Sequence, residues 1–187
     1  MKEYKTISLR RYHLVELAVF ALFAAIMFIS RYSLQIVHGL HPLTLIIAAF
    51  TMVWRKRALI LIYLYVGLEF AFGSFAWVWP YLYIFLPLWA MVMFWAWLFE
   101  RRPKIRVPVK ATALMFTCGL HGMTFGLMYA PAQMLIMRIT SWEAIAAWIV
   151  AGLPFDAVHA GFQFALGLLV LPIAALLEKL RRSARMT

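Results

Sequence analysis

Long apolar runs dominate this chain, and short polar connections separate them. A helix needs about 20 mostly apolar residues to cross the hydrocarbon core of a bilayer, and the runs approach or reach that length. The predicted spans cover residues 12–31, 40–54, 58–75, 81–99, 109–129 and 154–178. The pattern therefore predicts an all-α membrane protein with six transmembrane helices, folded as a single integral membrane domain over residues 1–187.

One further apolar piece, residues 141–152, is too short to cross a bilayer. Ser141 is a suitable N-cap, and Glu143 falls in the first turn, where the helix dipole favours an anion. Pro131 interrupts the preceding span, and Pro154 suits the first turn of the next helix. We therefore expect a short interfacial or re-entrant helix on the outer side, just before the last span.

The positive charges are sorted along the chain. All but two of the 18 lysine and arginine residues fall into four clusters, at residues 2–11, 55–57, 101–110 and 179–185. Loops rich in lysine and arginine stay on the cytoplasmic side, and two predicted spans separate each cluster from the next. We therefore expect both termini and all four clusters in the cytoplasm, with Arg31 and Arg138 in the outer connections.

Composition supports a membrane protein and argues against other classes. Hydrophobic residues make up 66% of the chain and charged residues 13%, against roughly 45–50% and about 25% in soluble domains. A net charge of +11 would suggest nucleic acid in a soluble protein, but basic loops beside a bilayer face anionic lipid instead. The single cysteine, Cys118, gives no disulfide framework and no Cys-based metal site. There is no G-x-x-x-x-G-K-[ST] motif for ATP.

Polar residues within the last two spans are candidates for a binding site. A charge at mid-span costs roughly 2.5–3.5 kcal/mol on the insertion scale, so such residues need a partner or a wet cavity. Asp156, His159 and Gln163 are three and four residues apart, which places them on one helix face. The preceding span contributes His121, Phe125, Tyr129 and Gln133. Both sets fall in the outer half, so they predict a substrate cavity that opens outward between these spans.

Other candidates have structural alternatives that the sequence leaves open. Asp156 either lines the cavity or caps and bridges helices, and His121 either binds substrate or donates one hydrogen bond to a neighbouring backbone. Glu69, late in the third span, is either a cavity acid or a residue that reaches the outer interface.

Two further groups lie in the predicted outer connections. Trp79 and Tyr83 belong to an interfacial aromatic belt or form a stacking wall over a flat heterocyclic ligand. His38 and His41 flank a glycine in the first outer connection. We interpret them as loop residues near the cavity mouth rather than a metal site, because a third ligand is missing nearby.

Small residues form a strip on the first span. Ala18, Ala21 and Ala25 lie about one turn apart, and small residues let another helix approach closely in lipid. The strip serves either packing within this chain or docking of another membrane subunit.

Together these features resemble the substrate-binding (S) component of energy-coupling factor (ECF) vitamin transporters, over nearly the whole chain. Ala21 and Ala25 match the family's Ala-x-x-x-Ala docking motif. The stretch Gly152-Leu153-Pro154-Phe155-Asp156-Ala157-Val158-His159 resembles the segment that opens the last helix in many members. Tyr81-Leu82-Tyr83 and Tyr129-Ala130-Pro131-Ala132-Gln133 are similar to one subgroup. Gln163 stands where many relatives carry Asn, and the chain lacks the Met-His start of nickel and cobalt members.

The resemblance implies a high-affinity binding subunit of an ABC-type importer in a prokaryotic cell membrane. It would capture a vitamin or cofactor precursor outside and deliver it with a transmembrane coupling subunit and two ABC ATPases. This chain would hold no permanent cofactor, and ATP would bind only to the partner subunits. The subgroup likeness favours cobalamin (vitamin B12) or a related corrinoid. The alternative is a smaller vitamin, such as a pyridoxine-type compound, a thiamine precursor, pantothenate or a queuosine precursor.

Two other classes of function stay open from the residues alone. A stand-alone proton-coupled carrier would use Glu69 and Asp156. A small membrane enzyme would use Asp156, His159 and His121 as acid and base groups, but the sequence offers no nucleophile in a recognised setting. We therefore expect no catalytic residue.

Overall fold

The computed structural model describes residues 2–34, 41–73 and 75–186, and within these ranges the chain is helical and contains no strand. The helices are α1 (Lys2–Ser33), α2 (Leu43–Trp54), α3 (Ala58–Phe72), α4 (Phe75–Val78), α5 (Tyr81–Arg101), α6 (Val107–Met137), α7 (Trp142–Gly167) and α8 (Val170–Met186), and the 3₁₀ turn η1 (Arg55–Arg57) joins α2 to α3. The predicted all-α class is therefore confirmed.

The short helix α2 is the centre of the fold. Every residue of α2 except Met52 is buried, and α2 contacts α1, α3, α5, α6, α7 and α8. Its aromatic side chains pack against α1, where the rings of Phe50 and Trp54 lie 5.6 Å and 5.3 Å from that of Phe20. The buried hydroxyl of Thr51 donates to the carbonyl of Ile47 at 2.7 Å, which satisfies it within the helix.

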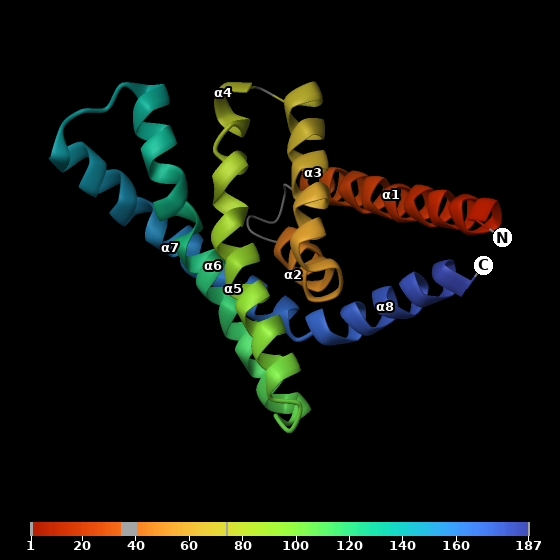
Figure 1. Cartoon of the computed structure of the whole chain (residues 1–187). Coiled ribbons are helices and arrows are strands. Elements are labelled where there is room, and N and C mark those ends of the chain that lie inside the picture. The colour runs from red at the N-terminus through yellow and green to blue at the C-terminus, as the bar shows by residue number, and fades with distance from the viewer. Residues whose placement is uncertain (1, 35–40, 74, 187) are drawn as a thin grey trace.

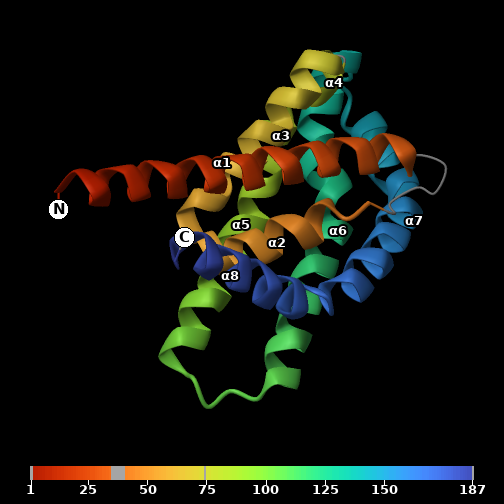
Figure 2. The same ribbon diagram turned by 90° about the vertical axis from the view of Figure 1, so that its right-hand side faces the viewer.

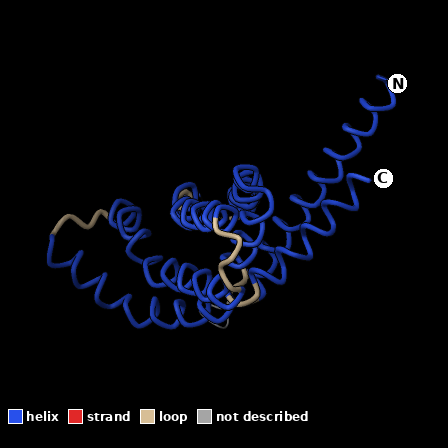
Figure 3. The backbone as a smooth tube through the Cα atoms, turned by 60° about the horizontal axis from the view of Figure 1, so that its bottom comes forward, coloured by secondary structure: helices blue, strands red, loops and turns tan. Residues whose placement is uncertain are grey.

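The helices do not form a bundle of parallel spans. α3, α5 and α6 lie roughly along one axis, with α5 antiparallel to the other two, whereas α1 and α8 run across them (Figure 1 and Figure 2). α1 and α8 leave the body on the same side, next to each other, as Figure 3 also shows. The connection between α5 and α6 lies at the opposite end from α4 (Figure 1). The aromatic connection at α4 and the basic connection between α5 and α6 thus lie at opposite ends.

Four helices are long and apolar enough to cross a membrane: His13–Ser33 of α1, then α5, α6 and α7. They correspond to the predicted spans 12–31, 81–99 and 109–129 and to the first part of 154–178. α2 and α3, with 12 and 15 residues, are only about 18 Å and about 22 Å long at 1.5 Å per residue. The chain is therefore a plausible multi-pass membrane protein in which α2, at least, is covered by protein more than by lipid.

The prediction of a separate interfacial or re-entrant helix is wrong. Residues 142–167 form one continuous helix, and Pro154 lies inside it rather than at its start. α6 likewise continues through Pro131 to Met137. The predicted N-cap is confirmed, because the Ser141 Oγ accepts a hydrogen bond from the Ala144 N–H at 3.3 Å. Proline is tolerated within helices of membrane proteins when neighbouring groups satisfy the freed carbonyls.

The predicted last span, 154–178, is also wrong in its course. The chain turns at Leu168 and Leu169, so α7 ends at Gly167 and α8 begins at Val170. Pro172 explains the break, because it has no N–H for the carbonyl of Leu168 and its ring would collide with that carbonyl in a continuous helix. The same residue is acceptable in the first turn of α8.

Candidate ligand-binding site between α2, α6 and α7

Glycines allow α6 and α7 to pack closely as an antiparallel pair. A Cβ on Gly122 would lie 2.9 Å from the Cα of Ala160, and a Cβ on Gly167 would lie 2.6 Å from the Cα of Met115. Only a residue without a side chain fits such a backbone approach. This packing places the polar face of α7 directly against α6.

Three polar residues meet where this pair reaches the start of α2. The Gln163 Nε2 donates to the backbone carbonyl of His41 at 3.1 Å and lies 3.1 Å from the His159 Nε2. The rings of His41 and His159 are 5.0 Å apart, edge to face. His159 and Gln163 are both buried, and the predicted common face of α7 is therefore present. His38 lies outside the described residues.

α6 brings His121 and Phe125 to the same place. The Phe125 ring lies 5.3 Å from the ring of His159 and 6.2 Å from that of His121. The other side of His121 faces Phe85 of α5, at 6.0 Å between ring centroids. We call His41, His121, Phe125, His159 and Gln163 the histidine cluster.

The histidine cluster contains polar atoms without partners. Both ring nitrogens of His121 and the Oε1 of Gln163 are buried and have no hydrogen-bond partner among the described residues. Leaving a buried polar group unsatisfied costs about 1–3 kcal/mol, and such groups in native structures call for a water or a ligand. An imidazole with both nitrogens unused can donate to one ligand atom and accept from another.

An ion pair lies beside the histidine cluster. Arg31 of α1 pairs with Glu69 of α3, whose carboxylate is fully buried. The guanidinium of Arg31 also lies 5.0 Å from the ring centroid of Tyr81, whose ring is 6.4 Å from that of Phe125. Glu69 therefore does not reach the outer interface, and Arg31, predicted in an outer connection, lies within α1. Arg31 and Tyr81 were not predicted as site residues. A buried glutamate needs a cation, and Arg31 is one of only two cations outside the four basic clusters.

Tyr83 joins α5 to α6, and Tyr129 joins α6 to α4. The Tyr83 hydroxyl donates to the carbonyl of Met128 at 3.0 Å, and the Tyr129 hydroxyl donates to the carbonyl of Trp77 at 2.7 Å. Trp79 packs against Tyr83 with ring centroids 6.0 Å apart. The Tyr129 ring is stacked on that of Phe125 at 6.4 Å, so Tyr129 adjoins the histidine cluster.

Asp156 and Gln133 lie apart from the histidine cluster. The Asp156 Oδ1 accepts a hydrogen bond from the Gly126 N–H at 3.1 Å, so this carboxylate bridges α7 to α6, which was one of the two alternatives for it. Gln133 is buried near the far end of α6, two turns beyond Gly126. Within the described residues, no group of three or more His, Cys, Asp or Glu side chains could hold a metal ion.

The small-residue strip lies on the surface of α1. Ala18 and Ala21 are exposed and Ala25 is half-buried, while the neighbouring Ala24 faces the core at 1% exposure. Packing within the described part of the chain therefore leaves the strip accessible at the surface.

Comparison with protein-family models, with curated proteins and with solved structures gives no significant match.

Proposed function

We propose that this chain is a membrane-embedded solute-binding subunit of the kind found in ECF importers, with the histidine cluster as its ligand site. The observation that carries the proposal is the set of buried, unpartnered polar atoms on His121 and Gln163, enclosed by aromatic rings. Small-molecule sites combine apolar and aromatic walls with a few oriented polar groups. This arrangement suits an organic molecule that carries a flat ring and both a hydrogen-bond donor and an acceptor.

The close spacing of the rings bears on which vitamin is bound. Ring centroids 5.0 Å to 6.4 Å apart across the histidine cluster are direct contact distances, so a ligand would have to part these rings. A small flat compound, such as a pyridoxine-type compound or a thiamine precursor, would part them least. Cobalamin, favoured by the subgroup likeness, is much larger and would require the outer ends of α5 and α6 to separate. Both sizes belong in the same binding test.

Isothermal titration of the purified protein in detergent against a panel of vitamins tests the proposal. We expect binding of one member, weakened at least tenfold by His121→Ala and Gln163→Ala, because each removes a hydrogen bond from a buried site. His13→Ala is the matched control, since His13 is exposed on α1. Binding that persists at full strength in both site variants would move the ligand elsewhere, and folded protein that binds no compound would count against a vitamin.

The docking part of the proposal has its own test. Ala21→Trp fills the exposed strip and should abolish ATP-driven uptake in cells that supply the coupling subunit and ATPases, while ligand binding by the isolated chain persists. Leu22→Trp is the matched control, because Leu22 lies next to Ala21 and is 59% exposed. Equal uptake by the two variants would remove the docking role of the strip.

The contacts of the two candidate proton carriers favour structural roles. Glu69 is paired with Arg31 and Asp156 accepts a hydrogen bond from the Gly126 N–H, so each carboxylate joins two helices. Uptake into vesicles driven by a pH gradient, without ATPase partners, would nevertheless support a stand-alone carrier over the binding subunit.

A further inference from the structure

A second pocket lies at the basic end of the molecule, away from the histidine cluster. It has a volume of about 420 Å³ and lies between the end of α2, η1, α5, α8 and the first half of α1. We call it the basic pocket, and its lining residues are Glu16, Val53, Trp54, Arg55, Lys56, Arg57, Met93 and Arg181. Two of the four sequence clusters of lysine and arginine thus come together, and Glu100 of α5 pairs with Arg55 at the same corner.

The charge of the basic pocket is not balanced by its own carboxylates. Four cations and one carboxylate line it, and that carboxylate, Glu16, lies 2.9 Å from the Arg57 Nη1. Arg55 pairs with Glu100 at 2.6 Å, which lies outside the lining. Lys56 has no ion-pair partner in the described ranges. The excess of positive charge favours an anionic ligand.

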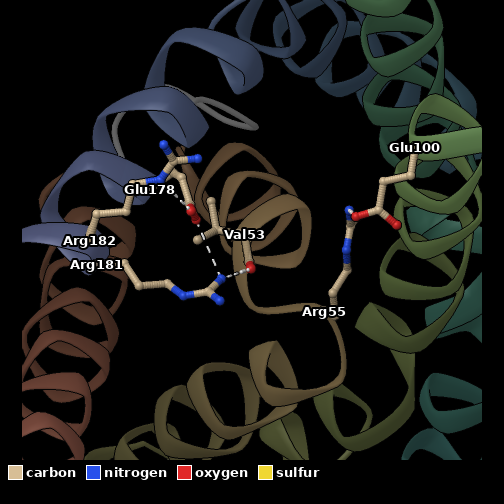
Figure 4. A network of polar contacts seen from close by, with 6 residues as sticks. All are labelled: Val53, Arg55, Glu100, Glu178, Arg181 and Arg182. Atoms are coloured by element: carbon tan, nitrogen blue, oxygen red, sulfur yellow. Dashed lines mark hydrogen bonds and ion pairs between the residues drawn. The ribbon is translucent and has the colours of Figure 1, made fainter. Parts of the chain in front are cut away.

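Arg181 is held in place at the edge of the basic pocket. Its Nη1 donates to the carbonyl of Val53 at 2.6 Å and lies 3.4 Å from the Glu178 Oε2. The other carboxylate oxygen of Glu178, Oε1, accepts from the Arg182 Nε. Figure 4 shows Arg181 reaching from α8 to the end of α2, while Arg55 turns the other way toward Glu100. A guanidinium fixed by its neighbours loses little further freedom when it binds an anion.

Hydrogen-bond donors remain unused around the basic pocket. The Trp54 Nε1, one Arg55 nitrogen (Nη1) and the Arg181 Nε are buried and have no acceptor in the described part of the chain. All three are donors only, so a ligand rich in acceptors would satisfy them. A phosphate group offers several oxygens and forms strong charge-assisted hydrogen bonds with arginine.

We infer that the basic pocket binds a phosphate group, carried either by an anionic lipid or by free phosphate. Basic pockets between helices on the cytoplasmic side of membrane proteins bind anionic headgroups, and a pocket of a few hundred Å³ is large enough for a small ligand. Because α1 and α8 lie across the other helices here, such a ligand would hold them to α2.

Two arms of one experiment separate the sources of the phosphate. In the lipid arm, the protein is purified in phosphatidylcholine nanodiscs that contain a minor fraction of phosphatidylglycerol, and native mass spectrometry counts the retained anionic lipid. In the soluble arm, inorganic phosphate is titrated into detergent-purified protein by calorimetry. Retention of one phosphatidylglycerol per chain identifies a lipid headgroup, whereas saturable binding of phosphate alone identifies the free ion.

Matched variants test the location of the site. We expect Lys56→Gln and Arg181→Gln to weaken binding at least tenfold in the positive arm. Lys104→Gln and Arg106→Gln should have no such effect, because both residues are exposed in the connection between α5 and α6. Lys56 is itself exposed, so its variant is expected to fold normally even if Arg181→Gln does not.

Two results would overturn the inference. One is the absence of binding in both arms with folded protein. The other is an equal loss in all four variants, which would show that the ligand responds to overall positive charge and not to this pocket.

Discussion

Arg31 and Glu69 join α1 to α3 through an ion pair whose carboxylate is fully buried, whereas the arginine side chain is 26% exposed. Sequence reasoning at the scale of single residues found Glu69 but not its partner, because the two are 38 positions apart. In contrast, Asp156, His159 and Gln163 could be grouped correctly on one face of a helix because their spacing is local. His41 was expected near the cavity mouth, but its contact with Gln163 could not be predicted, since no periodicity connects a loop residue to a helix 122 positions later.

The ion pair gives the first prediction. Glu69→Leu leaves the charge of Arg31 without its partner, and breaking one half of a buried pair typically costs about 3–5 kcal/mol. We expect a marked fall in the thermal unfolding midpoint of the protein in detergent. The double variant Arg31→Met with Glu69→Leu should recover much of this loss, because two apolar residues replace two charges. A double variant as unstable as Glu69→Leu alone would mean that packing, rather than charge, determines the effect.

At the scale of helices, apolar length predicted the existence of α1, α5 and α6 well. The prolines, in contrast, led to wrong predictions of where the helices from α6 onward begin and end. Pro131 and Pro154 were predicted to interrupt or begin helices, but both lie within continuous helices. Pro172, for which no break was predicted, follows the actual break at Leu168. Local sequence cannot separate these cases, because whether a proline interrupts a helix depends on what else satisfies the freed carbonyl. Glycines also differ in their surroundings: Gly152 and Gly161 face open space, while Gly119, Gly122 and Gly126 face α7.

This difference between glycines gives the second prediction. Gly122→Ala would place a methyl group 2.9 Å from the Cα of Ala160, and overpacking of this kind costs about 1–3 kcal/mol. We expect lower stability in detergent and weaker ligand binding, because the α6–α7 pair carries most of the histidine cluster. Gly161→Ala on α7 meets nothing within 4 Å and should raise the free energy of unfolding by about 0.5–1 kcal/mol, since alanine favours the helix. If both variants were destabilised alike, the close packing of α6 on α7 would not be the cause.

At the scale of the whole molecule, the basic pocket and the histidine cluster lie in different parts of the fold. Contacts bring the end of α2 against α8 through Arg181 and against α5 through Arg55, whereas the histidine cluster takes His121 and Phe125 from the middle of α6. If the basic clusters face the cytoplasm, a ligand from outside would meet the histidine cluster and a cytoplasmic anion would meet the basic pocket. The direction of both follows from the positive-inside rule, which relates the sequence to a membrane that the fold alone does not orient.

Cysteine labelling tests that orientation directly. Lys56→Cys and Lys104→Cys place thiols in two of the basic clusters, and Thr140→Cys places one in the exposed connection between α6 and α7. The native Cys118 is buried at 0% exposure, so it should stay unlabelled and needs no replacement. In intact cells, a maleimide that cannot cross membranes should label only Thr140→Cys, and disruption of the cells should expose the other two. Labelling of Lys56→Cys or Lys104→Cys from outside would turn the molecule over, place the histidine cluster toward the cytoplasm and remove the physical basis for uptake.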